Sequence, residues 1–485
     1  MSKPLFINQF KNVYPLSIHS INNITVFVLK SDTEDALIIE GDNDLGFKGV
    51  LKHVAGFSYI EAPLSHANAN TLRFHFPFTK PIPVLRKMRS FGLGDRLGIA
   101  GEGHLEVFRN VDAFPVLAQQ SMRELTLTER TYEDVLDAAS FAAFKFGYHD
   151  GFGADGDHLK KMEDIERVLK IGYTMITLDC SDYIKNDVMQ MTDAEIEAKV
   201  KLPQELITRY VSEPFEIDGA TITFKEIDLK RAYYVYSDAI RYTKKVYDTF
   251  FKDHAYNANL ELSIDETMTP TKPEEHFYVA NELKLSGVIL DTLAPRFCGE
   301  FQKGVDYIGD INQFESELKI HAAIANHFDY KLSIHSGSDK FSIFTLIGKH
   351  TKGRFHIKTA GTNWLEAVRL VSVKDPALYR EVHAYALESF AEAKKLYHVT
   401  TDLTKIKALS TLSDSDLPKL FEQNDARQLI HITYGAILTA KNDDGSLRFK
   451  TRLYDLWRQH TKAYKDMLHS HIGRHVDMLY KGFKS

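Results

Sequence analysis

Histidine and carboxylate side chains recur where short apolar segments of this chain end. Asp157 and His158 end GADGDH, His335 ends KLSIH, His356 lies within RFHIK, and Glu266 ends LELSIDE. Imidazole is a ligand for Zn, Ni, Co or Mn in catalytic sites that keep positions open to water or substrate. Two carboxylates in different environments suit general acid and base catalysis, because each can be held in a different protonation state. These residue types therefore predict a metal-assisted acid–base site.

Each of these residues also has a purely structural interpretation. An Asp at a loop-to-helix junction is commonly an N-cap, which applies to Asp157. A histidine at a strand end can satisfy a backbone carbonyl, and Glu266 can be a surface charge. Three histidines with acids beside each one favour the site over these separate explanations, although they do not exclude them.

Four cations near the same segments are candidates for binding an anionic group. They are Arg96, Arg296, Lys340 and Lys358. Charge-assisted hydrogen bonds to a carboxylate or phosphate favour cations at such positions, whereas any one of them alone can equally be a solvated surface charge.

The segments that carry these residues alternate with helical patterns from about residue 89 onward. Strand followed by helix is typical of parallel strands with crossover connections, and eight such units close a (β/α)8 barrel. We therefore predict an α/β fold of the TIM-barrel type, with a doubly wound open sheet as the alternative. In both folds the C-terminal ends of the strands face the site. The predicted strands lie within residues 90–96, 144–158, 173–180, 260–266, 287–291, 330–340, 354–362 and 428–435.

The rest of the chain is predicted to flank this barrel. We expect a β-rich segment over 1–88, a barrel over 89–440 and closing helices over 441–485 that pack on the barrel. Insertions into the barrel are expected near 181–258 and 375–425. In the N-terminal segment, β-rich stretches predict strands at 24–30, 36–40 and 71–78, and the run RAYYVYSDAIRY has helical spacing.

Composition and missing motifs exclude several classes of protein. The 60 Lys and Arg against 66 Asp and Glu give a formal net charge of −6, which gives no reason to expect a nucleic-acid or anionic-membrane surface. Two cysteines are too few for a disulfide framework. GLGDRLG lacks the third glycine of a dinucleotide fingerprint, and no P-loop, HExxH or GxSxG motif occurs. The first residues show no secretory signal and no 18-residue apolar run follows, so we expect a cytoplasmic protein.

Seven strings in the chain resemble the tagaturonate epimerases of bacterial hexuronate catabolism. They run from about residue 90 to 371: SFGLGDRLGIA, GFGADGDHLK, ITLDCSDYI, LSIDETMTPT, GVDYIGD, LSIHSGSDKFS and FHIKTAGTNWLEAVRLV. GADGDHLK and HSGSDKFS are the specific ones. The resemblance implies a divalent-metal-dependent epimerase that interconverts D-tagaturonate and D-fructuronate.

The resemblance also implies roles for the matching positions. Asp157 would be the proton acceptor and Glu266 the proton donor. His158, His335 and His356 would be the metal ligands, with Glu300 as the substitute if one histidine is not. For the uronate carboxylate, Lys340 and Arg96 are the candidate binding residues. The metal would be Zn, Mn, Ni or Co, and no organic cofactor is needed.

Two routes would invert the carbon that lies β to the ketone and carries a hydroxyl. In a retro-aldol route a base removes the hydroxyl proton, the adjacent C–C bond breaks, and the aldehyde half rotates and recondenses, with a metal as Lewis acid. In the other route the carbon-bound proton is removed and returned by groups on opposite faces. A metal-dependent ketose isomerase or class II aldolase would use the same ligands, and a non-catalytic carbohydrate-binding protein would need no metal. The expected partner is a small keto acid, with no nucleic acid and no membrane, and a homo-oligomer is compatible with the sequence.

Overall fold

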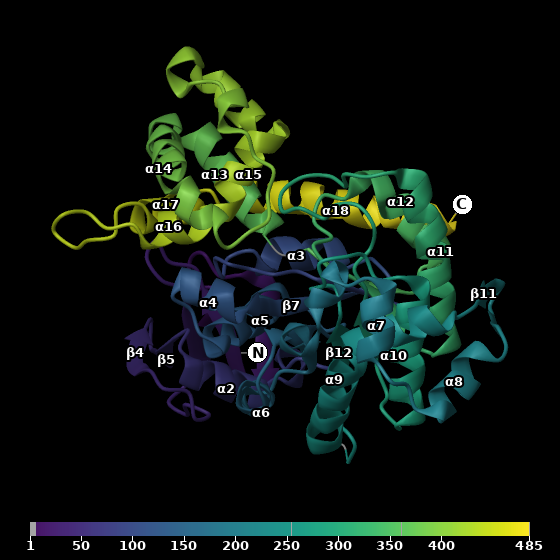
Figure 1. Ribbon diagram of the computed structural model, residues 1–485. Helices are drawn as coiled ribbons and strands as arrows, with labels where there is room; N and C mark the ends of the chain where they lie inside the picture. The colour runs from purple at the N-terminus through teal and green to yellow at the C-terminus, as the bar shows by residue number, and fades with distance from the viewer. Residues whose placement is uncertain (1–5, 254, 360, 485) are drawn as a thin grey trace. The chain divides into compact units, whose positions relative to one another are not determined.

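Eight parallel strands close into a barrel in this computed structural model, which describes residues 6–253, 255–359 and 361–484 (Figure 1). The order around the barrel is β12-β13-β14-β15-β6-β7-β8-β9. The predicted α/β barrel is thereby confirmed, and the open sheet is not formed. The strands are β6 (Arg89–Gly92), β7 (Phe114–Ser121), β8 (Gly153–Leu159), β9 (Met175–Asp179), β12 (Asn259–Ser263), β13 (Thr292–Ala294), β14 (Lys331–Ile334) and β15 (Phe355–Lys358).

Three barrel strands differ between prediction and structure. The segment 287–291, predicted as a strand, lies directly before β13 and is not extended into the sheet, since Gly287 with its φ of 80° belongs to the turn that ends α10 (Pro273–Leu285). β7 was not predicted, since its second residue is a proline and its end is polar (FPVLAQQS). The segment 428–435, predicted as a strand, instead belongs to helices α15 (Asn424–Ile432) and α16 (Tyr434–Thr439). Its residues are almost all buried, and a short buried apolar run has the same pattern in a helix as in a strand.

Helices follow the strands, as the barrel requires, and their ends carry recognisable signals. In α5 (Tyr132–Phe146), Thr131 and Asp134 form a reciprocal capping box, and Gly147 ends the helix in the left-handed conformation. α10 (Pro273–Leu285) begins with proline at its first position, where no amide hydrogen is needed. The others are α3 (Gly101–Phe108), α4 (Met122–Thr128), α6 (Met162–Ile171), α11 (Ile311–His327), α12 (Phe341–His350) and α13 (Thr362–Lys374).

An antiparallel five-stranded sheet precedes the barrel, in the order β1-β2-β3-β5-β4. The segment 71–78, predicted as a strand, lies instead mostly in helix α2 (His66–His75), which Ser65 caps by accepting from the Asn68 amide. The first five residues of the predicted β-rich segment lie outside the described residues. The strands are β1 (His19–Ile21), β2 (Ile24–Leu29), β3 (Ala36–Glu40), β4 (Val50–Val54) and β5 (Phe57–Pro63).

The two predicted insertions are largely helical. The first contains α7 (Asp193–Lys199), α8 (Gln204–Val211) and the long α9 (Glu226–Phe250), together with a hairpin of β10 (Phe215–Ile217) and β11 (Ala220–Ile222). The RAYYVYSDAIRY run lies in α9, so its helix prediction is confirmed. The second insertion contains α14 (Pro376–Lys394) and short 3-10 turns, and the chain ends with α17 (Lys450–Gln459) and α18 (Thr461–Lys484).

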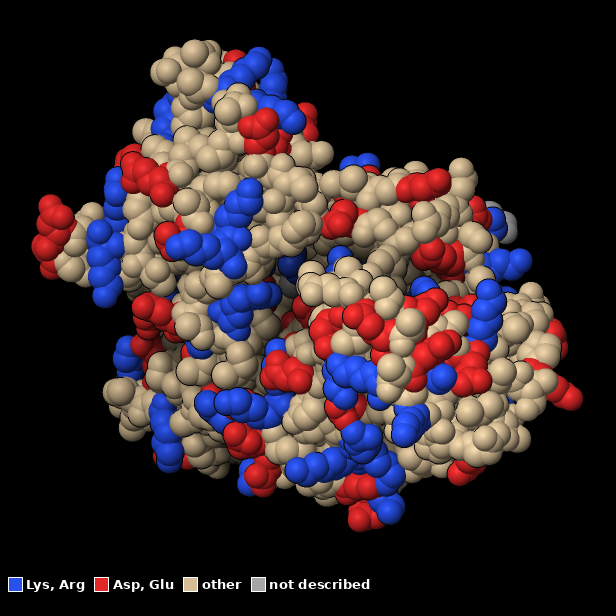
Figure 2. All heavy atoms as spheres, viewed as in Figure 1, with Lys and Arg blue, Asp and Glu red and all other residues tan. Residues whose placement is uncertain are grey.

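The chain divides into two compact units. One contains the chain up to Ile82 with Leu93–Ala154 and Gly361–Gly473. The other contains Pro83–Gly92, residues 155–359 and the chain from Arg474. Lys, Arg, Asp and Glu side chains are interspersed over the face shown in Figure 2. Across residues 6–253, 255–359 and 361–484, no helix is both long and apolar enough to span a membrane.

Candidate metal centre and active site

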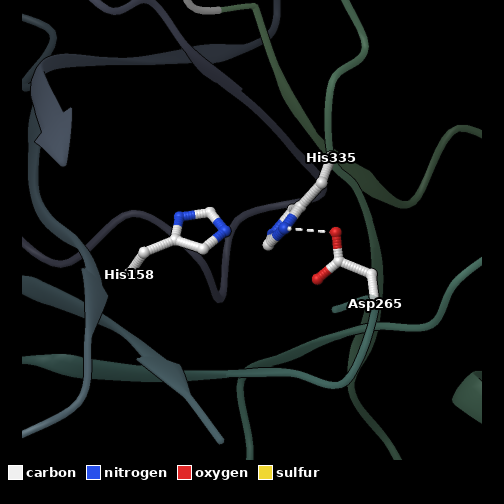
Figure 3. A group of neighbouring side chains, drawn as sticks. All are labelled: His158, Asp265 and His335. Carbon is white, nitrogen blue, oxygen red and sulfur yellow. Dashed lines mark ion pairs between the residues drawn. The ribbon is translucent and has the colours of Figure 1, made fainter. Parts of the chain in front are cut away.

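Two histidines and one aspartate converge at the C-terminal ends of barrel strands (Figure 3). His158 lies near the end of β8, Asp265 follows β12, and His335 directly follows β14. Each offers one ligand atom, and these atoms all lie within 4.8 Å of one another. The His335 Nδ1 atom is 3.2 Å from an Asp265 carboxylate oxygen, and the two imidazole centroids are 5.1 Å apart.

The backbone at His158 is unusual for a residue with a side chain. Its φ is 56°, in the left-handed region that non-glycine residues rarely adopt. The pairing register between β8 and β9 shifts between Gly156 and Leu159, as at a β-bulge. A bulge changes the direction in which a side chain points and is frequent beside active sites. The local backbone therefore turns the imidazole toward the cluster.

Each imidazole uses its other nitrogen to contact a buried carboxylate. His158 Nδ1 lies 2.9 Å from Asp157, and His335 Nε2 lies 2.8 Å from Glu261. The ammonium of Lys358, on β15, joins the two carboxylates at 2.6 Å from Asp157 and 2.9 Å from Glu261. The cluster is therefore connected to a continuous network of charged side chains inside the barrel.

The balance of charge in this network determines its protonation. Burial alone would raise the pKa of Asp157, but the positive charges of His158 and Lys358 outweigh burial and hold that pKa well below its usual range. Glu261 is also buried, and Lys358 and His335 hold its pKa well below its usual range in the same way. Both carboxylates are therefore ionised at neutral pH.

The opposite shift applies to the imidazoles. Burial lowers the pKa of His335, but the carboxylates of Asp265 and Glu261 outweigh burial and raise it to about 10. The pKa of His158 is raised against burial chiefly by Asp157. Without a metal ion, these carboxylates therefore favour the protonated, positively charged form of both imidazoles. A metal ion that binds the imidazoles would displace those protons.

The donor set fits a divalent metal ion. Two imidazole nitrogens and one carboxylate oxygen make a three-ligand set of the kind that catalytic zinc and related metals use, with further positions left for water or substrate. The carboxylate behind each imidazole matches the arrangement that commonly orients metal-binding histidines. The three donor atoms and the carboxylates that orient the two imidazoles therefore suit a divalent metal ion.

The two carboxylates predicted for acid–base chemistry flank this cluster. Asp157 is buried against His158, as described above. Glu266 follows Asp265 in the sequence, its side chain is about half exposed (51%), and its carboxylate lies 4.0 Å from His158 Nε2. Glu300 lies in the loop after β13, where its backbone amide donates to the carbonyl of Ile308, and it does not belong to the ligand group.

His356, predicted as a third imidazole ligand, lies outside the group of His158, Asp265 and His335. It is fully buried on β15, two residues before Lys358, and its Nδ1 atom is 2.9 Å from the Ser90 hydroxyl on β6. Burial lowers the pKa of His356 to about 3. It is therefore a neutral imidazole in a deeper layer of the barrel.

The two cations predicted to bind substrate are engaged with other protein groups. The ammonium of Lys340 is fully buried and donates to the carbonyls of Gln302, Val305 and Ser338. The guanidinium of Arg96 lies in the other compact unit, where it donates to Glu124 at 2.6 Å and stacks 3.9 Å from the ring centre of Tyr434. Both side chains hold protein segments together.

Sequence reasoning did not single out Asp265 and Glu261. Asp265 precedes Glu266 at the same strand end, so the same positional signal applied to both. Glu261 is a lone carboxylate inside the strand LELS, which a buried strand tolerates only when the charge is paired. A charged side chain among apolar strand residues was therefore the feature of the sequence that could have identified Glu261 as part of a buried polar network.

Comparison with known proteins identifies the family of this chain and agrees with its fold. A model of the tagaturonate epimerase family matches residues 14–479. A tagaturonate/fructuronate epimerase of Thermotoga maritima is 41% identical over 473 residues, which covers 96% of each chain. Crystal structures of a fructuronate-tagaturonate epimerase from Cohnella laeviribosi match with a TM-score of 0.94 over 98% of each chain, at 48% identity for a glycerol complex and 47% for the native structure. This chain belongs to the tagaturonate epimerase family of isomerases.

Proposed function

We propose that this protein is a divalent-metal-dependent epimerase that interconverts D-tagaturonate and D-fructuronate. The observation that carries the proposal is the convergence of His158, Asp265 and His335 at the C-terminal end of the barrel, with Asp157 and Glu266 beside them. His158, Asp265 and His335 would hold the metal, which as a Lewis acid would stabilise negative charge on substrate oxygens. Family membership and the near-complete coverage of the relatives support the substrate pair.

The two carboxylates suit opposite steps of such a reaction. Asp157 is ionised, as a proton acceptor must be before the proton moves. In a retro-aldol route it takes the proton of the hydroxyl on the inverted carbon, the adjacent C–C bond breaks, and the bonding electrons remain on the fragment that carries the ketone. After the aldehyde rotates and the bond re-forms, the proton returns to the new alkoxide. Glu266, closer to solvent, would supply a proton on the other side of the cluster.

An NMR time course tests the reaction and its metal requirement. D-tagaturonate is incubated with chelator-treated protein and with the same protein after restoration with Mn, Zn, Ni or Co. Formation of D-fructuronate only in restored samples is expected. Conversion without any metal would contradict the metal requirement, and no conversion with any metal would contradict the proposed substrate pair.

The same experiment in D₂O tests for exchange of the carbon-bound proton, and the absence of exchange leaves a retro-aldol route or a proton that is returned unexchanged. Deuterium at the inverted carbon would show that the carbon-bound proton is exchanged. Its absence is expected for a retro-aldol route, since no C–H bond at that carbon breaks. Cleavage products or a positional ketose isomer would instead indicate an aldolase or an isomerase on the same barrel.

A further inference from the structure

We propose that Glu261 is the positioning residue for His335, and that it determines which imidazole nitrogen faces the metal. The proposal rests on the metal site described under Proposed function and extends it to a residue inside the barrel. Glu261 lies on β12 and is completely buried. A buried carboxylate is tolerated only where enough donors satisfy it.

Four donors, three from other strands and one from the residue directly after β14, converge on this carboxylate. One oxygen accepts from His335 Nε2 at 2.8 Å, Lys358 Nζ at 2.9 Å and the Thr177 hydroxyl at 3.1 Å, and the other oxygen accepts from the Thr292 hydroxyl at 2.6 Å. Thr177 and Thr292 are also the Cα partners of Glu261 on β9 and β13. The strand register itself therefore fixes the carboxylate.

This arrangement fixes the orientation of His335. A carboxylate oxygen accepts hydrogen bonds, so the contact at Nε2 is an N–H donated to Glu261, and Nδ1 is the nitrogen directed at Asp265, 3.2 Å away. Figure 3 shows this nitrogen facing the Asp265 carboxylate across the cluster. A ring that rotated by a half turn would lose the contact with Glu261, so the same residue selects the ligand atom and holds the ring angle.

Asp155 provides a matched control within the same network. Its carboxylate is completely buried and contacts Lys358 Nζ at 2.9 Å and the Thr177 hydroxyl at 2.9 Å, as Glu261 also contacts both groups. No contact between Asp155 and His335 is among those described. Asp155→Asn and Glu261→Gln therefore each replace a carboxyl group of the same network by an amide, but only the second changes the group that holds His335.

The test measures Co²⁺ binding to the whole chain. The dissociation constant is obtained by competition with a chelator, and the visible d–d spectrum reports the geometry around the metal. For Glu261→Gln we expect affinity about 10–100-fold weaker than wild type and an altered spectrum, the usual cost of losing such a partner. For Asp155→Asn we expect a much smaller loss and the wild-type spectrum. Thermal unfolding of the metal-free variants is recorded alongside, and Glu261→Asp, which retains the charge, replaces Glu261→Gln if that variant does not fold.

The outcomes separate this inference from the proposed function. If wild-type protein binds one Co²⁺ and the Glu261 and Asp155 variants lose affinity equally, the positioning role is wrong while the metal site remains. If Glu261→Gln binds as tightly as wild type with the same spectrum, the role is also wrong. If wild-type protein takes up no Co²⁺, the metal site of the proposed function fails and the positioning role fails with it.

Discussion

At the scale of single residues, the three imidazoles inside this barrel differ by their neighbours. His158 and His335 each have a carboxylate behind the ring and lie with Asp265. His356 contacts Ser90 instead and lies two residues before Lys358 on the same strand. Rise along a strand is about 3.3 Å per residue, so His356 lies roughly 6–7 Å deeper than the layer of Lys358. Because of this difference in depth, we expect the loss of His335 and the loss of His356 to affect metal binding differently.

His335→Ala should lose bound metal and activity together, whereas His356→Ala should retain metal. The first variant removes a ligand atom from a three-residue set, and the second removes a neutral ring in a deeper layer. Metal content after gel filtration, measured by elemental analysis, decides between them. Full metal occupancy in His335→Ala, or loss of metal in His356→Ala, would show that the ligand group is assigned incorrectly.

At a metal concentration that saturates the site, Asp157→Asn should lower kcat by about 10²–10⁴-fold, the usual contribution of a general acid or base. Its metal affinity should also fall, because the carboxylate behind His158 is lost. The amide still fills the space beside His158 but can no longer take a proton. Single-turnover rates and metal content are measured on the same samples. The exposed Asp182, which pairs with Lys160, gives the control variant Asp182→Asn, for which we expect the wild-type rate. A near-normal kcat at saturating metal would instead show that Asp157 acts mainly by holding His158.

At the scale of elements, the loops after β13 and β14 are held together by one buried ammonium. Lys340 directly precedes α12 as its N-cap residue, and its ammonium donates to the carbonyls of residues 302 and 305 in one loop and of residue 338 in the other. The second loop begins at His335, and Ser336 and Asp339 in it have positive φ values. Such backbone conformations persist only where surrounding contacts determine them. The ammonium therefore stabilises the loop that carries a candidate metal ligand.

Lys340→Met should lower the free energy of unfolding by about 2–4 kcal/mol, since three buried carbonyls lose a charged donor. The Michaelis constant for D-tagaturonate should change little. Lys349→Met is the control, because Lys349 lies on the same helix with its side chain more than half exposed (58%) and pairs with Glu315. A large rise in the Michaelis constant with unchanged stability would instead assign Lys340 to the substrate carboxylate.

At the scale of the whole molecule, buried neutral histidines couple stability to pH. Burial lowers the pKa values of His104, His321 and His383 to about 4 in each case. The unfolded chain binds these protons near pH 6.5, whereas the folded chain binds them only near pH 4. Their contribution to stability is therefore complete above pH 6.5 and is lost as the pH falls from 6.5 to 4.

His383→Gln should make the free energy of unfolding less dependent on pH between 6.5 and 4. Each such histidine contributes a slope of about 1.4 kcal/mol per pH unit in this window, which the variant removes. Urea unfolding followed by circular dichroism at several pH values measures the slope. His469→Gln, at an exposed position on α18, should leave the profile unchanged. An identical slope in His383→Gln and wild type would contradict the coupling.

The sequence by itself determined the barrel and the edge at which its polar groups gather. Few folds other than a barrel accommodate short apolar segments that end in charged residues and alternate with helical patterns. Six of the eight predicted strands overlap barrel strands, and a seventh, 287–291, ends directly before β13. The failures at 71–78 and 428–435 have one cause. A short buried or alternating apolar run has the same local pattern in a strand as in a helix that tertiary contacts bury, and only packing distinguishes them.

Tertiary structure alone decided which polar residues meet. Alternation along a strand shows that His356 and Lys358 share a face, but not that they lie at different depths in the barrel, because depth depends on the register between neighbouring strands. The same register places Thr177 and Thr292 on either side of Glu261 and so makes a buried carboxylate tolerable. For this reason Asp265, and not His356, lies with His158 and His335. Distances between strands come from their pairing, and a single sequence contains no record of that pairing.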